Sequence, residues 1–234
     1  MKNRFIIFLI IITLLIVLII IIAYKLNIIP QRQYNNLDFN IKTYISNIDK
    51  DNDGIDDQTD ILNNVKKYIK TKPKYQSKYY NTGYPNDEYG VCTDVVGFGL
   101  KDAGYDLMEL VNEDITDYKE RYNIKSIDKN IDFRRVRNLN IYLKNNHISL
   151  TTDLSKIEEW QGGDIIVFKD HIGIISDKRN KKGIPFLIHH ASPMQINYEE
   201  DVLELYDKDY IIGHYRISWI KLNIKNKKCH NKKG

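Results

Sequence analysis

One cysteine and three histidines are the residues in this sequence best suited to nucleophilic chemistry. Cys92 lies in "EYGVCTDVVGFGLKDAG" and His171 in "KDHIGIIS", and His189 and His190 follow as an adjacent pair. A thiol acyl-transfer site needs a nucleophile, a base that takes its proton and a residue that orients this base. The four residues supply these parts, and a cysteine packed in the core is the alternative interpretation of Cys92.

The segment after Cys92 has the pattern of a short helix. Val95, Val96, Phe98 and Leu100 form its apolar face, and Ala103-Gly104 ends it. Cys92 then falls in the first turn, where free backbone N–H groups and the helix dipole favour a thiolate and can hold an oxyanion. The nearby Asp94 either caps the helix or raises the pKa of the thiol.

The elements that would position these residues indicate an α+β fold. Helical patterns precede and follow Cys92, and after residue 150 short β-branched runs bounded by Gly, Asp or Lys-Lys-Gly take over. Helices followed by consecutive short strands are typical of helices packed on an antiparallel sheet. We expect helices at residues 61–69, 92–102, 114–125 and 134–146, and strands at 164–168, 171–176, 185–190 and 211–218.

The ordered motifs resemble a known group of proteins. "GVCTDVV", "GGDIIVF", "HIGIIS" and "LIHHAS" are similar to the NlpC/p60 branch of papain-like cysteine peptidases. With "DGIDDQTDIL", "IDFRRVRNL" and "GHYR" added, residues 49–217 resemble more closely the bacterial domain-of-unknown-function family numbered 1287, a relative of that branch. The resemblance implies a papain-like NlpC/p60-type fold with the cysteine at a helix start.

The resemblance also implies residue roles. Cys92 would be the nucleophile, His171 the general base and His189 the third residue, with His190 as the alternative. Adjacent strand residues point to opposite faces, so only one of the two paired histidines should line the site. Where the family tends to have Asp-His-Arg-Arg, this chain has Phe133 before its arginines; an exposed helical face and a substrate carboxylate are the alternatives for Arg134 and Arg135.

The first residues predict a membrane anchor. Phe5 to Ala23 is a run of 19 residues without a charge, long enough to cross a bilayer as a helix, and no small-x-small cleavage site ends it. We expect residues 1–4 in the cytoplasm, a single-pass signal-anchor at 5–24, a linker at 25–40, an extracellular domain at 41–220 and a basic disordered tail at 221–234. A cleaved signal peptide is the alternative.

An Asp-rich loop at residues 49–60 has the order of a calcium site. Acidic residues fall at positions 1, 3, 5, 9 and 12, a glycine at position 6, and position 7 offers a backbone carbonyl. Such an oxygen-rich arrangement suits calcium. The predicted ligands of a structural Ca²⁺ ion are Asp49, Asp51, Asp53, Ile55, Asp57 and Asp60; an Asp-rich turn that caps the next helix is the alternative.

The distribution of charged residues limits the classes of binding partner that we expect. The net charge of +4 is unevenly distributed along the chain. Residues 1–32 contain four Lys/Arg, the tail from Lys221 contains six, and neither segment has an acidic residue. The body between them, residues 33–220, therefore has 25 basic and 31 acidic residues and a net charge of −6. An acidic body excludes nucleic acid as an expected partner.

The function expected from these features is that of a monomeric, membrane-anchored extracellular cysteine hydrolase. It would cleave amide bonds in peptidoglycan stem peptides or another cell-surface substrate. The alternatives are a non-catalytic, calcium-stabilised cell-wall-binding module and a thiol acyltransferase that uses the same site.

Overall fold

The computed structural model describes residues 2–25, 29 and 32–218 and divides the chain into two compact units, Met1–Gln33 and Tyr34–Gly234. The predicted basic tail at 221–234 and part of the predicted linker at 25–40 lie outside the described residues.

The first unit contains one helix, α1 (Lys2–Lys25). Within its segment Asn3–Tyr24, a window of 18 residues has a mean hydropathy of 3.8, and none of this window is buried by the protein. A helix of this length and composition is able to cross a membrane, and signal sequences near an N-terminus share both properties. The predicted apolar helix is therefore present.

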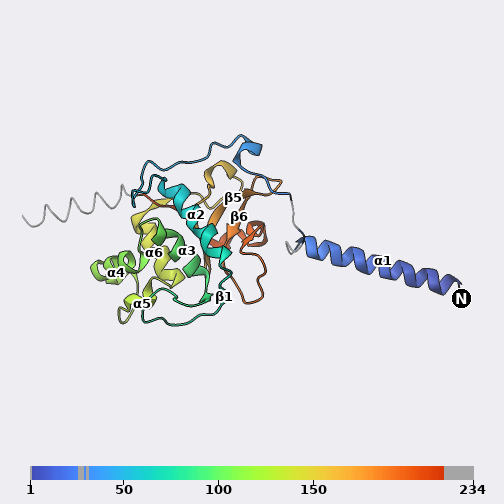
Figure 1. The fold of residues 1–234 in the computed structure, drawn as a ribbon, viewed down its shortest axis with the longest axis horizontal. Helices are drawn as coiled ribbons and strands as arrows, with labels where there is room; N and C mark the ends of the chain where they lie inside the picture. Colours follow the sequence, from blue (N-terminus) through green and yellow to red (C-terminus); the bar gives the residue numbers. More distant parts are fainter. Residues whose placement is uncertain (1, 26–28, 30–31, 219–234) are drawn as a thin grey trace, which may run out of the picture. The chain divides into compact units, whose positions relative to one another are not determined.

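The second unit begins with helices and continues with strands, as expected for an α+β protein (Figure 1). The predicted helix at 114–125 starts earlier, because Asp106 caps it by accepting a hydrogen bond from the N–H of Met108. The α-helices are α2 (Asp57–Lys70), α3 (Cys92–Asp102), α4 (Leu107–Asp117), α5 (Lys129–Asp132) and α6 (Val136–Asn146). Short 3-10 helices lie at Asn36–Phe39, Lys119–Arg121, Ile157–Glu159, Leu203–Leu205 and Lys208–Tyr210.

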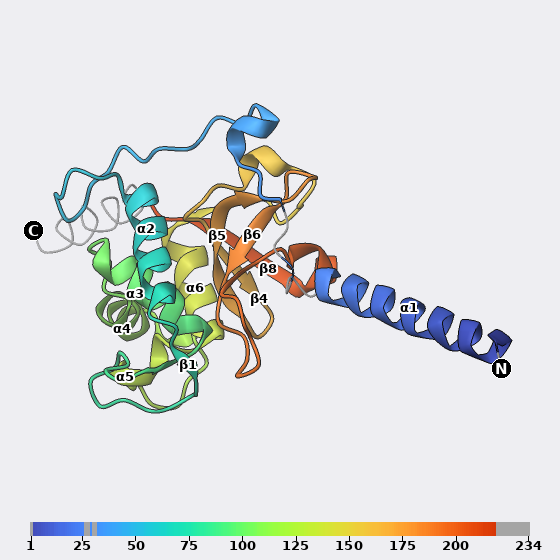
Figure 2. The same cartoon turned by 45° about the vertical axis from the view of Figure 1, so that its right-hand side comes forward.

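The main sheet is antiparallel with the strand order β3-β8-β4-β5-β6-β7, and Figure 2 shows β8, β4, β5 and β6 beside the helices. β8, the last strand among the residues that the structure describes, thus lies between β3 and β4. Its strands are β3 (Ile148–Ser149), β4 (Ile165–Phe168), β5 (Ile172–Arg179), β6 (Pro185–Ile188), β7 (Glu199–Glu200) and β8 (Ile211–Arg216). A separate parallel pair joins β1 (Lys74–Tyr75) to β2 (Tyr89–Gly90).

Apolar residues cover both faces of the sheet. In β4, Ile165 and Val167 pack with the helices, whereas Ile166 and Phe168 join a second cluster around Trp160. This division follows from the alternation of side chains along a strand. β4 is buried along its whole length, which explains why its sequence is a continuous apolar run.

Helices α2 and α3 bring Cys92 to the sheet. The two helices pack together, and α3 also packs on β5. A Cβ atom at Gly99 would lie 2.1 Å from Cγ2 of Val65, so a glycine on α3 is required for this close approach. The start of α3 therefore has a fixed position relative to the start of β5.

Candidate functional site

Cys92 is the first residue of α3, at the turn predicted from sequence. Val91 precedes it in an extended conformation, and Asp94 Oδ2 accepts a hydrogen bond of 2.8 Å from the N–H of Val91. Asp94 therefore caps the helix by reaching back to the residue before the cysteine. A glycine is needed just upstream, because a Cβ atom at Gly90 would lie 2.4 Å from the hydroxyl oxygen of Tyr68.

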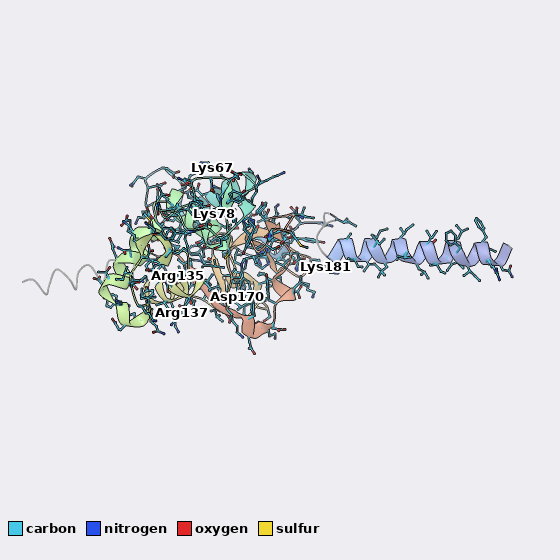
Figure 3. All side chains as sticks on the ribbon, turned by 90° about the horizontal axis from the view of Figure 1, so that it is seen from below. Lys67, Lys78, Arg135, Arg137, Asp170 and Lys181 are labelled. Carbon is cyan, nitrogen blue, oxygen red and sulfur yellow. The ribbon has the colours of Figure 1, made fainter. Side chains whose placement is uncertain are left out.

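Arg134 holds Asp94 in place. Its Nε and Nη2 donate to the two carboxylate oxygens of Asp94 at 2.7 and 2.9 Å, and both side chains are buried. The expectation of an exposed helical face is wrong for Arg134, because the planar guanidinium pairs with a buried carboxylate in bidentate fashion. Arg135 is exposed, as expected (Figure 3), but it precedes α6 as the N-cap residue, and it donates to Asp132.

Three side chains form a hydrogen-bonded row at the ends of neighbouring strands. His171 directly precedes β5, His189 directly follows β6, and Glu200 ends β7. His171 Nε2 and His189 Nδ1 are 2.8 Å apart, and His189 Nε2 is 3.1 Å from Oε2 of Glu200. The sheet order places these strand ends side by side, which brings residues 171, 189 and 200 together.

The row fixes which ring nitrogens carry hydrogen. A glutamate carboxylate only accepts, so the hydrogen between Glu200 and His189 belongs to His189 Nε2. A neutral His189 then has a bare Nδ1, which accepts from Nε2–H of His171. Nδ1 of a neutral His171 is consequently unprotonated, and a general base requires such a nitrogen.

Cys92 lies beside the start of β5. The backbone N–H of Ile172, the residue after His171, is among the groups that lower the pKa of the Cys92 thiol. Burial, together with the charge of Asp94, outweighs these N–H groups and raises this pKa to about 11. Burial and then His189 lower the pKa of His171 to about 3. At neutral pH the pair is therefore an uncharged thiol and an uncharged imidazole.

His190 has different neighbours from His189. Its ring stands edge-on to those of Tyr75 and Tyr198, with centroids 5.2 and 5.0 Å away, and its Nδ1 is buried without a hydrogen-bond partner. Tyr75 lies near Cys92: burial, and after it the negative charge that Cys92 carries once deprotonated, raises the pKa of the phenol. The structure thus brings His171 and His189 together, while His190 belongs to an aromatic cluster.

A second buried hydrogen-bond network, around Asp164, joins the start of β4 to β8 and α2. Asp164 accepts hydrogen bonds from His214 Nε2 at 3.0 Å, from Arg216 at 2.7 Å and from Gln58 of α2 at 2.9 Å. Burial alone would raise the pKa of Asp164, but the hydrogen bonds from His214 and Arg216 outweigh it and lower this pKa. His214 also stacks on Trp160 with ring centroids 3.8 Å apart, so its role is structural.

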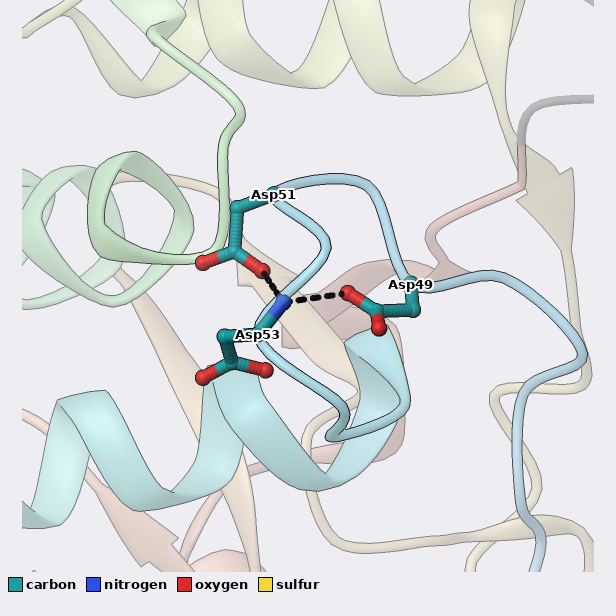
Figure 4. A group of neighbouring side chains, drawn as sticks. All are labelled: Asp49, Asp51 and Asp53. Atoms are coloured by element: carbon teal, nitrogen blue, oxygen red, sulfur yellow. Dashed lines mark hydrogen bonds between the residues drawn. The ribbon is translucent and has the colours of Figure 1, made fainter.

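The Asp-rich loop brings together three of its predicted ligands. One carboxylate oxygen each of Asp49, Asp51 and Asp53 lies within 4.8 Å of the others, as Figure 4 illustrates. Asp57 instead accepts from the N–H of Lys50 at 2.8 Å and from the hydroxyl of Tyr105. Asp60 is buried in the first turn of α2, while the Ile55 side chain is exposed and its N–H donates to Asp53.

The roles of two residues at the site were not predicted from sequence. Glu200 was not singled out, and no local motif marks it, because it reaches His189 only through the pairing of β6 with β7. Arg134 was considered, but its partner Asp94 is 40 residues away in sequence. No local signal marks this ion pair, because Arg134 stands among other charged residues, Asp132, Arg135 and Arg137.

Comparison with known proteins places this architecture in a family. The family model described as "Domain of unknown function (DUF1287)" matches residues 62–217. The chain belongs to the DUF1287 family. The matched range contains Cys92, His171, His189 and Glu200, whereas the Asp-rich loop at 49–60 precedes it.

A bacterial protein is similar to more than half of the chain. The chain is 34% identical over 153 residues to "Uncharacterized protein YijF" of Escherichia coli (strain K12). The matched region covers 62% of this chain and 72% of YijF. No solved structure matches the chain. Membership of the DUF1287 family is therefore confirmed, while the relation to NlpC/p60 proteins and the papain-like fold stay predictions.

Proposed function

We propose that this protein is a cysteine hydrolase that cleaves amide bonds at the cell surface, with peptidoglycan stem peptides as its substrate. The observation that carries the proposal is the row Glu200–His189–His171, together with the contact of the Cys92 thiol with the backbone N–H of Ile172, the residue after His171. A histidine whose free nitrogen is fixed by a hydrogen-bonded partner is what a thiol nucleophile needs as its base.

The proposed reaction begins with proton transfer. Nδ1 of His171 takes the proton of the Cys92 thiol as the sulfur attacks the amide carbonyl carbon. Backbone N–H groups at the start of α3 hold the oxyanion, and His171 returns the proton to the departing amine. Water, deprotonated by His171, then attacks the thioester, which releases the carboxylic acid and restores the thiol.

The pKa shifts describe the resting state of this site. With the thiol pKa raised to about 11 and the His171 pKa lowered to about 3, both by burial, the resting pair is uncharged. Deprotonation of the thiol is then coupled to its attack on the substrate. The reason is that the N–H groups at the helix start stabilise the negative charge on the carbonyl oxygen, which forms only during the attack. Small thiol reagents should therefore react slowly with Cys92.

The location of the substrate follows from α1. An apolar segment at Asn3–Tyr24 is long enough to hold the chain at a membrane, and with the amino end inside the cell the unit from Tyr34 onward lies outside. Peptidoglycan is the amide-rich polymer next to a bacterial membrane. This topology and the substrate are parts of the proposal.

The test compares the full-length protein, purified in detergent, with its Cys92→Ala variant on isolated sacculi. We expect new amino groups and soluble muropeptides from the wild type and only background release from the variant. Cys229→Ala is the matched control, because it removes the other cysteine of the chain, and it should keep full activity. Background release by all three proteins would refute the hydrolase proposal.

A further inference from the structure

The loop that joins β6 to β7 is folded around one side-chain amide. The ends of the loop are paired, because the N–H of His189 donates to the carbonyl of Tyr198 at 2.9 Å. Inside the loop, Gln195 Oε1 accepts from the N–H of Ala191 at 2.6 Å, and Gln195 Nε2 donates to the carbonyl of Asn197 at 2.8 Å. The amide of Gln195 therefore holds both arms of the loop.

The same amide reaches the hydrogen-bonded row. Gln195 Nε2 also donates to the carbonyl of His189 at 3.2 Å and to Oε2 of Glu200 at 3.1 Å. Oε2 is the same carboxylate oxygen that lies 3.1 Å from Nε2 of His189. One oxygen of Glu200 thus accepts from the histidine and the glutamine together. Three acceptors surround the two hydrogens of the glutamine NH₂ group, so one hydrogen is shared.

Apolar packing does not fix this loop. The side chains on either side of Gln195, Met194 and Ile196, are 86% and 71% exposed, and residues 191–197 are all at least partly exposed. Without a buried apolar side chain, hydrogen bonds must offset the entropy that is lost when the loop is ordered. The amide of Gln195 is therefore the group that sets the position of the loop against Glu200.

We propose that Gln195 is a positioning residue: its side-chain amide keeps the carboxylate of Glu200 on Nε2 of His189. The Glu200 side chain is 15% exposed, so water reaches the carboxylate and competes with the histidine for it. A second donor on the same oxygen restricts the rotation of the carboxylate. With Glu200 held in this way, His189 keeps one tautomer and Nδ1 of His171 stays unprotonated.

The first test needs no substrate. In the full-length protein, purified in detergent at neutral pH, ¹⁵N NMR of labelled histidine rings identifies the nitrogen that carries hydrogen, with His171→Asn and His189→Asn to assign the signals. Both wild-type rings should have hydrogen on Nε2 alone. Gln195→Met keeps the length of the side chain but removes the hydrogen bonds of its amide, so its ring signals should average over two tautomers. An unchanged single tautomer in Gln195→Met would overturn the proposal.

The second test is kinetic and rests on the proposed hydrolase function. In Gln195→Met, kcat for muropeptide release should fall about 10- to 100-fold with KM nearly unchanged, because a misplaced base affects the reaction rather than substrate binding. Adding Gln195→Met to Glu200→Gln should cost no further rate, since the amide acts through this carboxylate. Losses that multiply in the double variant would contradict the proposal. If the wild type releases no muropeptides, the hydrolase proposal fails and the NMR result alone decides the role of Gln195.

Ser192→Ala is the matched control. Oγ of Ser192 accepts from the N–H of Met194 at 3.3 Å, a hydrogen bond of the same loop that does not reach the row. Ser192→Ala and Gln195→Met both remove loop hydrogen bonds and should lower the Tm by only a few degrees. Only Gln195→Met should change the tautomers and kcat. If Ser192→Ala changed both as strongly, the effect would come from the folding of the loop, and Gln195 would not be a positioning residue.

Discussion

At the scale of single residues, the direction of the hydrogen bonds at the site depends on Glu200. Its carboxylate accepts from His189 Nε2 and from Gln195 Nε2, both at 3.1 Å, and it has no hydrogen to offer. This acceptor-only end sets the tautomer of both histidines in the row. Glu200 acts through His189 and is thus a positioning residue rather than a catalytic one.

Glu200→Gln should therefore impair catalysis with little effect on folding. A glutamine amide can donate as well as accept, so the row can reverse and place a hydrogen on Nδ1 of His171. We expect kcat for muropeptide release to fall about 10²–10⁴-fold with KM nearly unchanged. Glu200→Asp should recover part of the rate, because aspartate is again acceptor-only.

Glu199→Gln is the matched control for this prediction. Glu199 is the neighbouring residue in β7 and bonds to Ser176 and Lys178 instead of the histidines. Its variant should keep most of the activity. If Glu200→Gln and Glu199→Gln had equal rates, Glu200 would have no role in orienting the row.

The sequence could indicate the site residues of rare type, but not those of common type. Cys92 is one of two cysteines and His171 one of six histidines, so their types alone draw attention. Glu200 is one of 31 acidic residues, and an irregular loop separates it from β6, so no periodicity predicts where it lies. The pairing of His189 with His171 required the actual strand register.

At the scale of elements, the contact between α2 and α3 connects the Asp-rich loop to the Cys92 helix. Gly99 provides the space for Val65 where the two helices meet, and Ile61 O lies 3.5 Å from the position of an added Cβ atom. A residue larger than glycine must push the helices apart, since Val65 is stiff and fully buried.

Gly99→Ala should lower the free energy of unfolding by about 1–3 kcal/mol, because overpacking forces side chains and backbone to shift. The measurement is urea unfolding of the chain that begins at Tyr34, whose unit contains both apolar clusters. Combining Gly99→Ala with Val65→Ala should recover part of this loss. A single variant as stable as the wild type would contradict the close packing.

The elements were predictable where local chemistry dominates. The runs at 164–168 and 211–218 became β4 and β8. β4 is buried along its whole length, and a strand buried on both faces needs a continuous apolar run. The helix expected at 114–125 ends at Asp117 instead, and the buried Tyr122 that follows donates to Asp114. That tertiary contact of a tyrosine cannot be deduced from helical periodicity.

At the scale of the whole molecule, the buried His171 links the stability of the domain to pH. The pKa of His171 is lowered from 6.5 to about 3 by burial and then by His189. The unfolded chain gains a proton as the pH falls below about 6.5, whereas the folded chain gains it only near pH 3. Stability is thus complete above pH 6.5 and is lost as the pH falls through this window.

His171→Asn removes this titration. Between pH 7 and pH 5 the wild type should lose up to about 2 kcal/mol more unfolding free energy than the variant, since one pKa unit corresponds to about 1.4 kcal/mol. Urea unfolding of the unit from Tyr34 at several pH values measures the difference. Between pH 7 and pH 8 the two proteins should change in parallel, and an equal loss at pH 5 would show that His171 is not buried as a neutral ring.

The position of β8 in the sheet also bears on how the protein is made. β8 lies between β3 and β4, although no described strand comes later in the sequence, and it supplies His214 and Arg216 to Asp164. During synthesis the sheet has a gap at this place until residues 211–216 have left the ribosome. Nascent chains stopped before Ile211 would expose the open edge of β4 and lack two donors to a buried carboxylate. Chaperones and proteases should therefore distinguish an unfinished chain from a finished one at this single strand.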